Sequence, residues 1–215
     1  VGAVERLTKE AAAAKAAYLA AAEQLSALRR DTAKKFDRGV AAELPPLKLE
    51  RAAFSTIIVR ADESDWSARG IDRVRFEAAT NPGQPPGPLN KIASGGELSR
   101  FMLALKVVLA KADPVPTLVF DEVDSGIGGA TADAVGERLA RLAKDVQILV
   151  VTHSPQVAAR AAQQMRVSKA TAKGAAITRV ESLAAAERRE EIARMLSGAA
   201  VTDEARAAAG RLIDA

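Results

Sequence analysis

Several residue types are scarce in this 215-residue sequence or missing from it. Because there is no cysteine, the chain can form neither disulfides nor thiolate metal sites, and a single histidine offers little for a zinc site. Aromatic residues make up only 3%, so a core must be built mainly from alanine, valine, leucine and isoleucine. No apolar run approaches the roughly 20 residues of a membrane span. The net charge of +4 permits nucleic-acid binding without requiring it.

The phosphate-binding motif G-x-x-x-x-G-K-S/T is also missing, and the sequence contains no Gly-Lys pair. The segment that would cradle the α- and β-phosphates of a nucleotide is therefore not in this chain. The first residue is Val1 rather than methionine, and we expect the chain to be a fragment of a longer protein.

Residues 1–38 are predicted to form one long helix with a heptad seam, because small and apolar residues recur at alternating spacings of three and four. The heptad seam consists of Val4, Leu7, Ala11, Ala14, Tyr18, Ala21, Leu25, Leu28 and Thr32. Gly39 and the pair Pro45-Pro46 are predicted to end the helix and to separate a domain at 1–43 from one at 44–215. The seam requires a partner helix from a missing part of the protein or from another chain. The alternative is a single amphipathic helix packed on a globular core.

Two strand-like runs follow, at about 47–60 and 72–80. In the second run Val74, Phe76 and Ala78 alternate with charged residues, as in a half-buried antiparallel strand. The segment NPGQPPGP, at 81–88, is predicted to contain no regular structure. The later predicted elements are helices near 130–144 and 155–163, a hairpin at about 165–181, and helices near 185–197 and 203–214.

The segment TLVFDEVDSGIGG, at 117–129, is a candidate for chemistry. Its apolar residues are typical of a buried parallel strand, and Asp121 and Glu122 stand at the end of that strand. Two acids there are costly unless they face a metal or a reacting group, which suggests a Walker B strand. Asp121 would hold Mg²⁺ through a water, and Glu122 would polarise a water for attack on a phosphate. The alternative is a strand that ends in acids at a solvent edge.

A further predicted helix begins at Ser94, with the sequence SGGELSRFMLALKVVLAK. Ser94 and Glu97 could form a capping box. A capping box does not account for Gly95 and Gly96, each of which costs up to about 1 kcal/mol relative to alanine inside a helix. Consecutive glycines at a helix N-terminus let backbone N–H groups approach an anion, and phosphate is the candidate.

The only histidine, His153, follows a second predicted buried strand at 146–151. In α/β folds, ligand-contacting groups gather at the carboxyl ends of strands. A lone histidine is more often structural or exposed, but a position at the second strand end of one sheet favours a functional role.

These segments resemble the motifs of ABC-type ATPases in their order and spacing. Residues 94–97 resemble the signature motif, 117–122 the Walker B strand, Asp124 the D-loop and His153 the switch histidine. Glu97, where transporters usually have glutamine, points to the SMC-like branch of these ATPases.

The resemblance is more specific at three segments, 91–106, 120–129 and 151–159, which are similar to those of bacterial RecN-type DNA repair proteins. It covers roughly residues 81–215. Ser154 departs from the leucine expected there, with little consequence for the chemistry.

The resemblance implies an α/β fold. Residues 44–215 would form the C-terminal lobe of an ABC/SMC-type P-loop NTPase head, with a parallel sheet flanked by helices and an antiparallel part. Residues 1–43 would be the C-terminal helix of an antiparallel coiled coil. The N-terminal half of the same protein would supply the coil partner and the Walker A lobe. The whole protein would be a cytoplasmic, nucleoid-associated ATPase of DNA double-strand break repair and recombination.

The resemblance also implies a mechanism, in which two heads clamp two ATP molecules head to tail in a homodimer and act on DNA. Glu122 would be the general base, His153 would contact the γ-phosphate, and Asp121 would orient Mg²⁺. The residues that would bind nucleotide and couple the two sites are Ser94, Gly95, Gly96, Glu97 and Asp124. We expect the fragment alone to be inactive, since it lacks the Walker A motif.

Two other functions remain open. An ATP-binding subunit of an ABC transporter would not need the heptad helix or Glu97, and a structural coiled-coil module with a non-catalytic head would not need Asp121, Glu122 and His153 together. A basic cluster near the predicted coil–head junction could contact DNA phosphates, and the alternative is a solvated helix face. The cluster consists of Arg29, Arg30, Lys34, Lys35 and Arg38.

Overall fold

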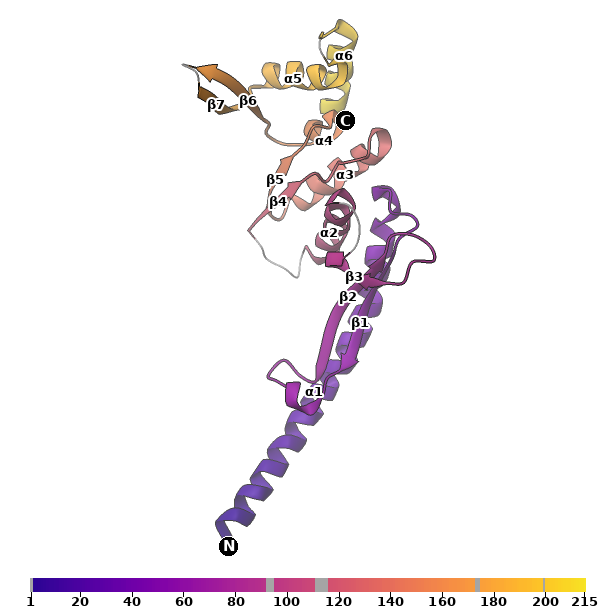
Figure 1. Ribbon diagram of the computed structural model, residues 1–215, viewed down its shortest axis with the longest axis vertical. Helices are drawn as coiled ribbons and strands as arrows, with labels where there is room; N and C mark the ends of the chain where they lie inside the picture. The colour runs from indigo at the N-terminus through magenta and orange to yellow at the C-terminus, as the bar shows by residue number, and fades with distance from the viewer. Residues whose placement is uncertain (1, 92–94, 111–115, 173–174, 199) are drawn as a thin grey trace. The chain divides into compact units, whose positions relative to one another are not determined.

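The structure, a computed structural model, describes residues 2–91, 95–110, 116–172, 175–198 and 200–215 (Figure 1). The chain divides into two compact units. The first comprises Val1–Glu43 and Arg51–Ile92, and the second comprises Leu44–Glu50 and Ala93–Ala215. None of the helices in the described ranges combines the length and the apolar character needed to cross a membrane.

Helix α1, Gly2–Glu43, confirms the predicted long helix and is about 60 Å long at 1.5 Å per residue. The prediction that Gly39 ends it is wrong, because one glycine inside a helix costs only about 1 kcal/mol. The helix ends before Pro45 because proline has no N–H to donate to the carbonyl four residues earlier, although Leu44 still has helical backbone angles, φ −69° and ψ −46°. Pro45–Leu47 then form the short 3-10 helix η1.

A three-stranded antiparallel sheet, in the order β1-β2-β3, completes the first unit. Strand β1, Ala53–Arg60, pairs along its whole length with β2, Asp72–Ala79. β1 starts later than predicted, because the chain first turns through η1 and a left-handed residue, Lys48, with φ 59°. The prediction of no regular structure at 81–88 is wrong at its end, where β3, Gly87–Pro88, pairs with β2. The short 3-10 helices η2 and η3 occupy Glu63–Asp65 and Leu89–Lys91.

The β1–β2 hairpin packs on α1 through the face predicted from its alternating pattern. The Phe76 ring lies 5.6 Å from Phe36 of α1 and 5.5 Å from Phe54 of β1, measured between ring centroids. Asp37 of α1 accepts hydrogen bonds from both the backbone N–H and the hydroxyl of Thr56. This carboxylate therefore satisfies one backbone donor on the unpaired edge of β1, which would otherwise be open to other strands.

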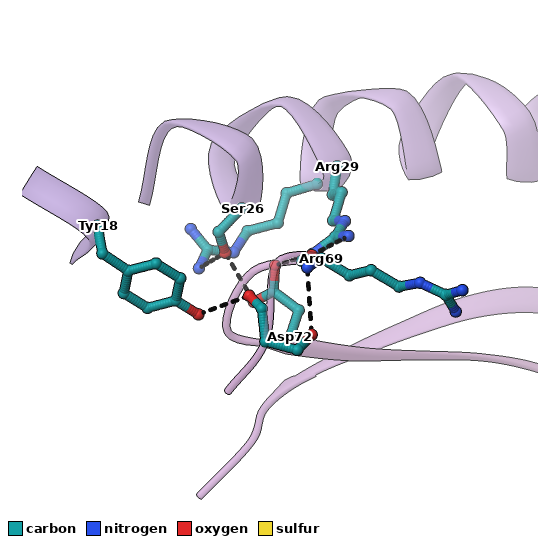
Figure 2. Close-up of polar contacts among 7 residues, drawn as sticks. Tyr18, Ser26, Arg29, Arg69 and Asp72 are labelled. Atoms are coloured by element: carbon teal, nitrogen blue, oxygen red, sulfur yellow. Dashed lines mark hydrogen bonds and ion pairs between the residues drawn. The ribbon is translucent and has the colours of Figure 1, made fainter. Parts of the chain in front are cut away.

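A polar cluster fastens the far end of the hairpin to α1 (Figure 2). The Asp72 carboxylate, 2% exposed, accepts hydrogen bonds from Ser26 Oγ at 2.9 Å and from Arg29 Nη1 at 3.0 Å. Arg29 also donates to the Arg69 carbonyl at 2.7 Å, and the Tyr18 hydroxyl donates to another carbonyl of the β1–β2 loop. Burial of Asp72 is thus compensated by a charged partner and a neutral donor.

Trp66, the only tryptophan of the chain, lies in the same loop. Its ring centroid is 6.0 Å from that of Tyr18, and its indole N–H donates to the Ala61 carbonyl at 3.0 Å. The Arg60 guanidinium lies 5.6 Å from the indole centroid, within the range of a cation–π interaction. The loop is therefore fixed to α1 by aromatic as well as polar contacts.

Most of the heptad seam on α1 is exposed, although two of its residues reach the hairpin loop. Val4, Leu7 and Leu28 are 69%, 56% and 65% exposed. Tyr18 of the seam donates to a carbonyl of that loop, and Leu25 lies against Gly70, where an added Cβ would be 3.2 Å from Leu25 Cδ2. The seam is therefore not what packs α1 on the sheet, and most of it remains available for another helix.

Strands β4, Thr117–Asp121, and β5, Gln147–Val151, form a parallel pair in the second unit, as predicted. The pair is not buried on both faces. Val119, Leu149 and Val151 are 66%, 46% and 63% exposed, whereas Phe120 is 7% exposed. A continuous apolar run suits a strand covered on both sides, so within the described residues only one of the two covering layers is present.

The covering helices are α2, Gly95–Leu109, α3, Gly129–Leu142, and α4, Pro155–Ala159. α2 and α4 both contact α3. α4 is shorter than the predicted helix at 155–163, and Arg188 donates to the carbonyls of Ala158 and Ala159 at its end. These bonds satisfy helix-terminal carbonyls that have no partner within the helix.

The C-terminal part matches the prediction closely. β6, Met165–Ala172, and β7, Ala175–Ser182, form the expected hairpin, and helices α5, Ala185–Ser197, and α6, Asp203–Asp214, follow it. Thr202 caps α6 by accepting the Ala205 N–H. The buried cluster beneath these helices contains Ala159, Ile192, Ala193, Ala205 and Ala209.

The first turn of α2 lies directly against the loop that follows β4. A Cβ atom added at Gly96 would lie 3.0 Å from Ser125 Cβ and 3.1 Å from the Ser125 carbonyl oxygen. At these distances only a residue without a side chain fits. Packing therefore accounts for one of the two glycines that the sequence attributes to anion binding.

We expect Asp72→Ala to lower the free energy of unfolding of the first unit by about 2 kcal/mol. Breaking a fully buried ion pair costs about 3–5 kcal/mol, but Arg29 is 26% exposed and can regain water. Hydrogen–deuterium exchange of the β1 and β2 amides should become faster. Asp31→Ala, in an exposed pair 4.0 Å from Lys34, is the matched control and should change little. Equal exchange in the two variants would contradict the role given to Asp72.

Gly96→Ala should destabilise the second unit by about 1–2 kcal/mol in denaturant unfolding. Overpacking against Ser125 costs about 1–3 kcal/mol, and the better helix propensity of alanine recovers at most about 1 kcal/mol of it. Gly210→Ala in α6 is the control, because nothing lies within 4 Å of the added Cβ. That variant should gain about 1 kcal/mol. A gain of the same size at Gly96 would show that the close approach is absent.

Candidate functional site

The carboxyl ends of β4 and β5 bring the predicted catalytic residues to one edge of a sheet. Asp121, the last residue of β4, is in register with Val151, the last residue of β5. Glu122 and Thr152 therefore leave the sheet side by side, and His153 follows one residue later. The predicted meeting of the two strand ends is confirmed by this parallel register.

Asp121 and Glu122 are both exposed at that edge. Glu122 has a φ of 55°, and among the described non-glycine residues only Lys48 shares a positive φ. Such a conformation costs on the order of 1–3 kcal/mol, and strained residues of this kind cluster at functional sites. The turn is held by the Ser125 N–H, which donates to the Glu122 carbonyl at 3.0 Å.

The first turn of α2 lies beside this pair of acids. A Cβ atom added at Gly95 would be 3.5 Å from Glu122 Oε2, which is an ordinary van der Waals distance. The Ser99 hydroxyl donates to the Asp121 carbonyl at 3.2 Å. The start of α2 and the end of β4 therefore form one surface. Ser94, with its predicted capping box, lies outside the described residues.

Asp124 is placed differently from the other predicted site residues. It is only 1% exposed, and its Oδ2 atom accepts hydrogen bonds from the Thr152 hydroxyl and from the Ser154 N–H at 3.1 Å. The same oxygen lies 3.8 Å from His153 Nδ1. The His153 side chain is 82% exposed. The structure thus turns the Asp124 carboxylate inward, toward the end of β5, and leaves the imidazole at the surface.

Arg100 is a second buried charge that the sequence interpretation overlooked. It is 5% exposed, and its Nη1 donates to the Ser125 carbonyl at 2.9 Å. Burial lowers the pKa of its guanidinium, and the nearby Glu97 carboxylate opposes that shift. An arginine beside Phe101 on the apolar side of a helix is the signal that could have identified it, because arginine is rarely buried without a partner.

The predicted basic cluster on α1 is largely engaged within its own unit. Arg29 binds Asp72, Arg30 donates to Ser26 Oγ at 2.8 Å, and Arg38 donates to the Lys34 carbonyl. Arg29 is thus needed for packing, whatever else the cluster contacts.

The carboxylate oxygens at the sheet edge are suitable ligands for a hard cation such as Mg²⁺. Among the described residues, no group of three or more His, Asp or Glu side chains could hold a metal by itself. Magnesium is commonly bound through one or two carboxylates together with substrate phosphates, so the two exposed acids at the end of β4 fit such an ion. The arrangement can also polarise a water through Glu122 and contact an anion through the backbone at the start of α2.

Comparison with known proteins places the chain in a family. The model of the RecF/RecN/SMC N terminal domain matches residues 15–175. The DNA repair protein RecN of Rickettsia bellii is 44% identical over 196 residues, which cover 91% of this chain and 35% of that protein. The RecN of Xylella fastidiosa strain 9a5c is 56% identical over 144 residues, covering 67% of this chain and 26% of that protein. The chain thus spans about a third of the length of its curated relatives or less.

A solved structure confirms the fold class. The Smc head domain with a coiled coil and joint from Pyrococcus yayanosii superposes with a TM-score of 0.54 at 21% identity. The match covers 77% of this chain and 29% of that one. It shows the α/β head fold, and the family assignment comes from the sequence matches. The chain therefore belongs to the RecF/RecN/SMC family, and its curated relatives are DNA repair proteins of the RecN type.

Proposed function

We propose that this chain forms half of the ATP site of an SMC-like ATPase that acts in DNA double-strand break repair. The observation that carries the proposal is the gathering of Asp121, Glu122, His153 and the start of α2 at one edge of the β4–β5 sheet. The similarity to proteins named as DNA repair proteins supports the biological setting.

Each group at this edge has a role in phosphoryl transfer to water. Asp121 would hold Mg²⁺, and the ion would supply positive charge close to the transferred phosphoryl group. Glu122 accepts the proton of the attacking water, and its strained backbone fixes where the carboxylate stands. His153, with its exposed imidazole, contacts the γ-phosphate. Positioning contributes most of the rate enhancement in such a reaction, so small displacements of these groups matter.

The signature segment binds nucleotide through the backbone at the start of α2. Ser94 keeps the role that its sequence position indicates, and Gly95 and Gly96 present N–H groups where the helix dipole favours negative charge. Glu97 stands in the same turn. Asp124 would act from a different place than the signature segment, because its carboxylate already accepts hydrogen bonds from residues at the end of β5.

The N-terminal half of the same protein is the proposed partner that completes the head. It would supply the Walker A motif, a cover for the exposed face at Val119, Leu149 and Val151, and a helix for the heptad seam. Residues 1–43 would then belong to an antiparallel coiled coil and residues 44–215 to the C-terminal lobe. The large exposed apolar area at both places is what such a partner would bury.

Two complete heads would bind two ATP molecules in an isologous dimer, with DNA as the macromolecular partner. A two-fold axis would bring the signature segment at the start of α2 of each head to the nucleotide held by the other head. ATP binding would close the heads and hydrolysis would open them.

In a complete head, in which this chain is joined to a Walker A segment, Glu122→Gln should preserve ATP binding. It should lower turnover by about 10²–10⁴, because general base catalysis is lost, and dimers should accumulate. Steady-state hydrolysis and light scattering with ATP measure the two effects. Glu10→Gln on the exposed surface of α1 is the control and should behave as wild type. Unchanged turnover in Glu122→Gln would exclude Glu122 as the base, whereas a wild-type complete head without any turnover would favour a structural module with a non-catalytic head.

The 215-residue chain alone should hydrolyse no ATP, since it contains no segment that cradles the α- and β-phosphates. Phosphate release by the purified chain, with and without Mg²⁺, tests this. The complete head, assayed in parallel, is the positive control. Mg²⁺-dependent turnover that is unaffected by Glu122→Gln would indicate a contaminant, and turnover abolished by that substitution would refute the prediction.

A further inference from the structure

The segment Leu44–Glu50, which follows α1, belongs to the second unit, although α1 itself belongs to the first. Its three leucines, Leu44, Leu47 and Leu49, are all buried. The 3-10 helix η1 within this segment contacts α3. The end of α1 is therefore continuous with a segment that is packed into the unit that carries the candidate site.

Lys48 is the exposed residue of this buried segment. Its φ of 59° is left-handed, a conformation that residues with long side chains seldom adopt. The turn is closed by the Lys48 N–H, which donates to the Pro45 carbonyl at 3.0 Å. Because the leucines on both sides of Lys48 are buried, the backbone from which its side chain extends is fixed.

The Lys48 ammonium reaches the loop that follows the two acids of β4. Its Nζ donates to the Gly126 carbonyl at 3.5 Å, which is long for a hydrogen bond. An ammonium acts as a point charge that attracts a carbonyl oxygen over a range of angles, so the contact stabilises the loop even at that distance. The carbonyl of the preceding residue, Ser125, accepts a hydrogen bond from Arg100 of α2 at 2.9 Å. Two consecutive carbonyls of the loop thus face cationic side chains from two different elements.

The loop held in this way determines where the candidate catalytic groups lie. It begins at Glu122, whose left-handed backbone is bonded to Ser125, and it contains the buried Asp124. Gly126 has a φ of 72° and no side chain with which to bind its surroundings. Contacts made from outside the loop therefore contribute to its position.

We propose that Lys48 is a positioning residue that holds the loop after Glu122 through the Gly126 carbonyl, and that it thereby links the end of α1 to the candidate site. The consequence for turnover rests on the proposed function. A shift at the end of α1 would move η1, withdraw the ammonium and loosen the loop. Lys48 acts through the loop and not on the nucleotide.

Hydrogen–deuterium exchange of the 215-residue chain tests the contact without ATP. Lys48→Met keeps the aliphatic stem and removes the charge, so the amides of residues 125–128 should exchange about two- to fivefold faster, as expected for the loss of one exposed charged contact. Lys48→Arg keeps a cation and should exchange as wild type does. Lys144→Met, at another exposed lysine of the second unit, is the matched control. Wild-type exchange in Lys48→Met would overturn the proposal and leave Lys48 as a solvated side chain.

A second substitution separates the ammonium from the backbone turn. Lys48→Gly suits a φ of 59°, so it should relieve backbone strain and still loosen the loop. If Lys48→Met loosened the loop and Lys48→Gly did not, strain rather than the ammonium would govern the loop and the proposal would fail. Faster exchange across the whole second unit in Lys48→Met would assign Lys48 to folding and would also overturn the positioning role.

In a complete head, Lys48→Met should lower kcat about three- to tenfold and leave the Kd for ATP unchanged, because the loop is displaced but the nucleotide contacts remain. Lys48→Arg should restore kcat, and Lys144→Met should not alter it. Wild-type kcat in Lys48→Met would overturn the role in turnover. A wild-type complete head without ATPase activity would refute the proposed function instead, and exchange at residues 125–128 would still decide whether Lys48 holds the loop.

Discussion

The parallel pairing of β4 with β5 is the constraint on which the second unit depends. It brings the residue after each strand to the same edge, so acids from one segment meet a hydroxyl and an imidazole some 30 positions later in the chain. The helix that precedes β4 is drawn to the same place, because Gly96 allows its first turn to touch Ser125. Three separate stretches of sequence thus form one surface, and the strain at Glu122 is tolerated because its neighbours on both sides are bonded in place.

The first unit depends on a different feature: one long helix both binds a hairpin and presents an exposed apolar seam. One face carries polar and aromatic residues that bind the β1–β2 hairpin, with Asp72 and Asp37 compensated by donors from the facing element. The heptad seam overlaps that face at Tyr18 and Leu25 and is otherwise largely exposed. The hairpin is held by directional hydrogen bonds and ring contacts, whereas the seam is defined only by apolar residues at a regular spacing. A helix fastened in this way has a defined rotation, so the seam faces one direction.

Periodicity and strand-end chemistry predicted the helices, two strands of the first sheet, the C-terminal hairpin, the parallel pair and most of the residues gathered at its edge. They failed where the outcome depends on contacts distant in sequence. The run at 118–120 predicts a strand covered on both faces, but one covering layer does not come from the described residues. Asp124 matches a motif, yet its burial follows from Thr152, 28 positions later, and no local pattern reveals that partner. Glycine is typical of helix ends, so Gly39 predicts one, but contacts such as that between Phe36 and Phe54 of the hairpin support this part of α1.

Trp66 gives the first unit an optical property. As the chain's only indole, it rests against Tyr18 of α1, with the Arg60 guanidinium over its ring. Emission from this chain therefore comes from a single place, the junction between helix and hairpin. Separation of the two would expose the indole to water and remove the neighbouring phenol at once. Trp66 fluorescence thus reports on the contact between α1 and the β1–β2 loop.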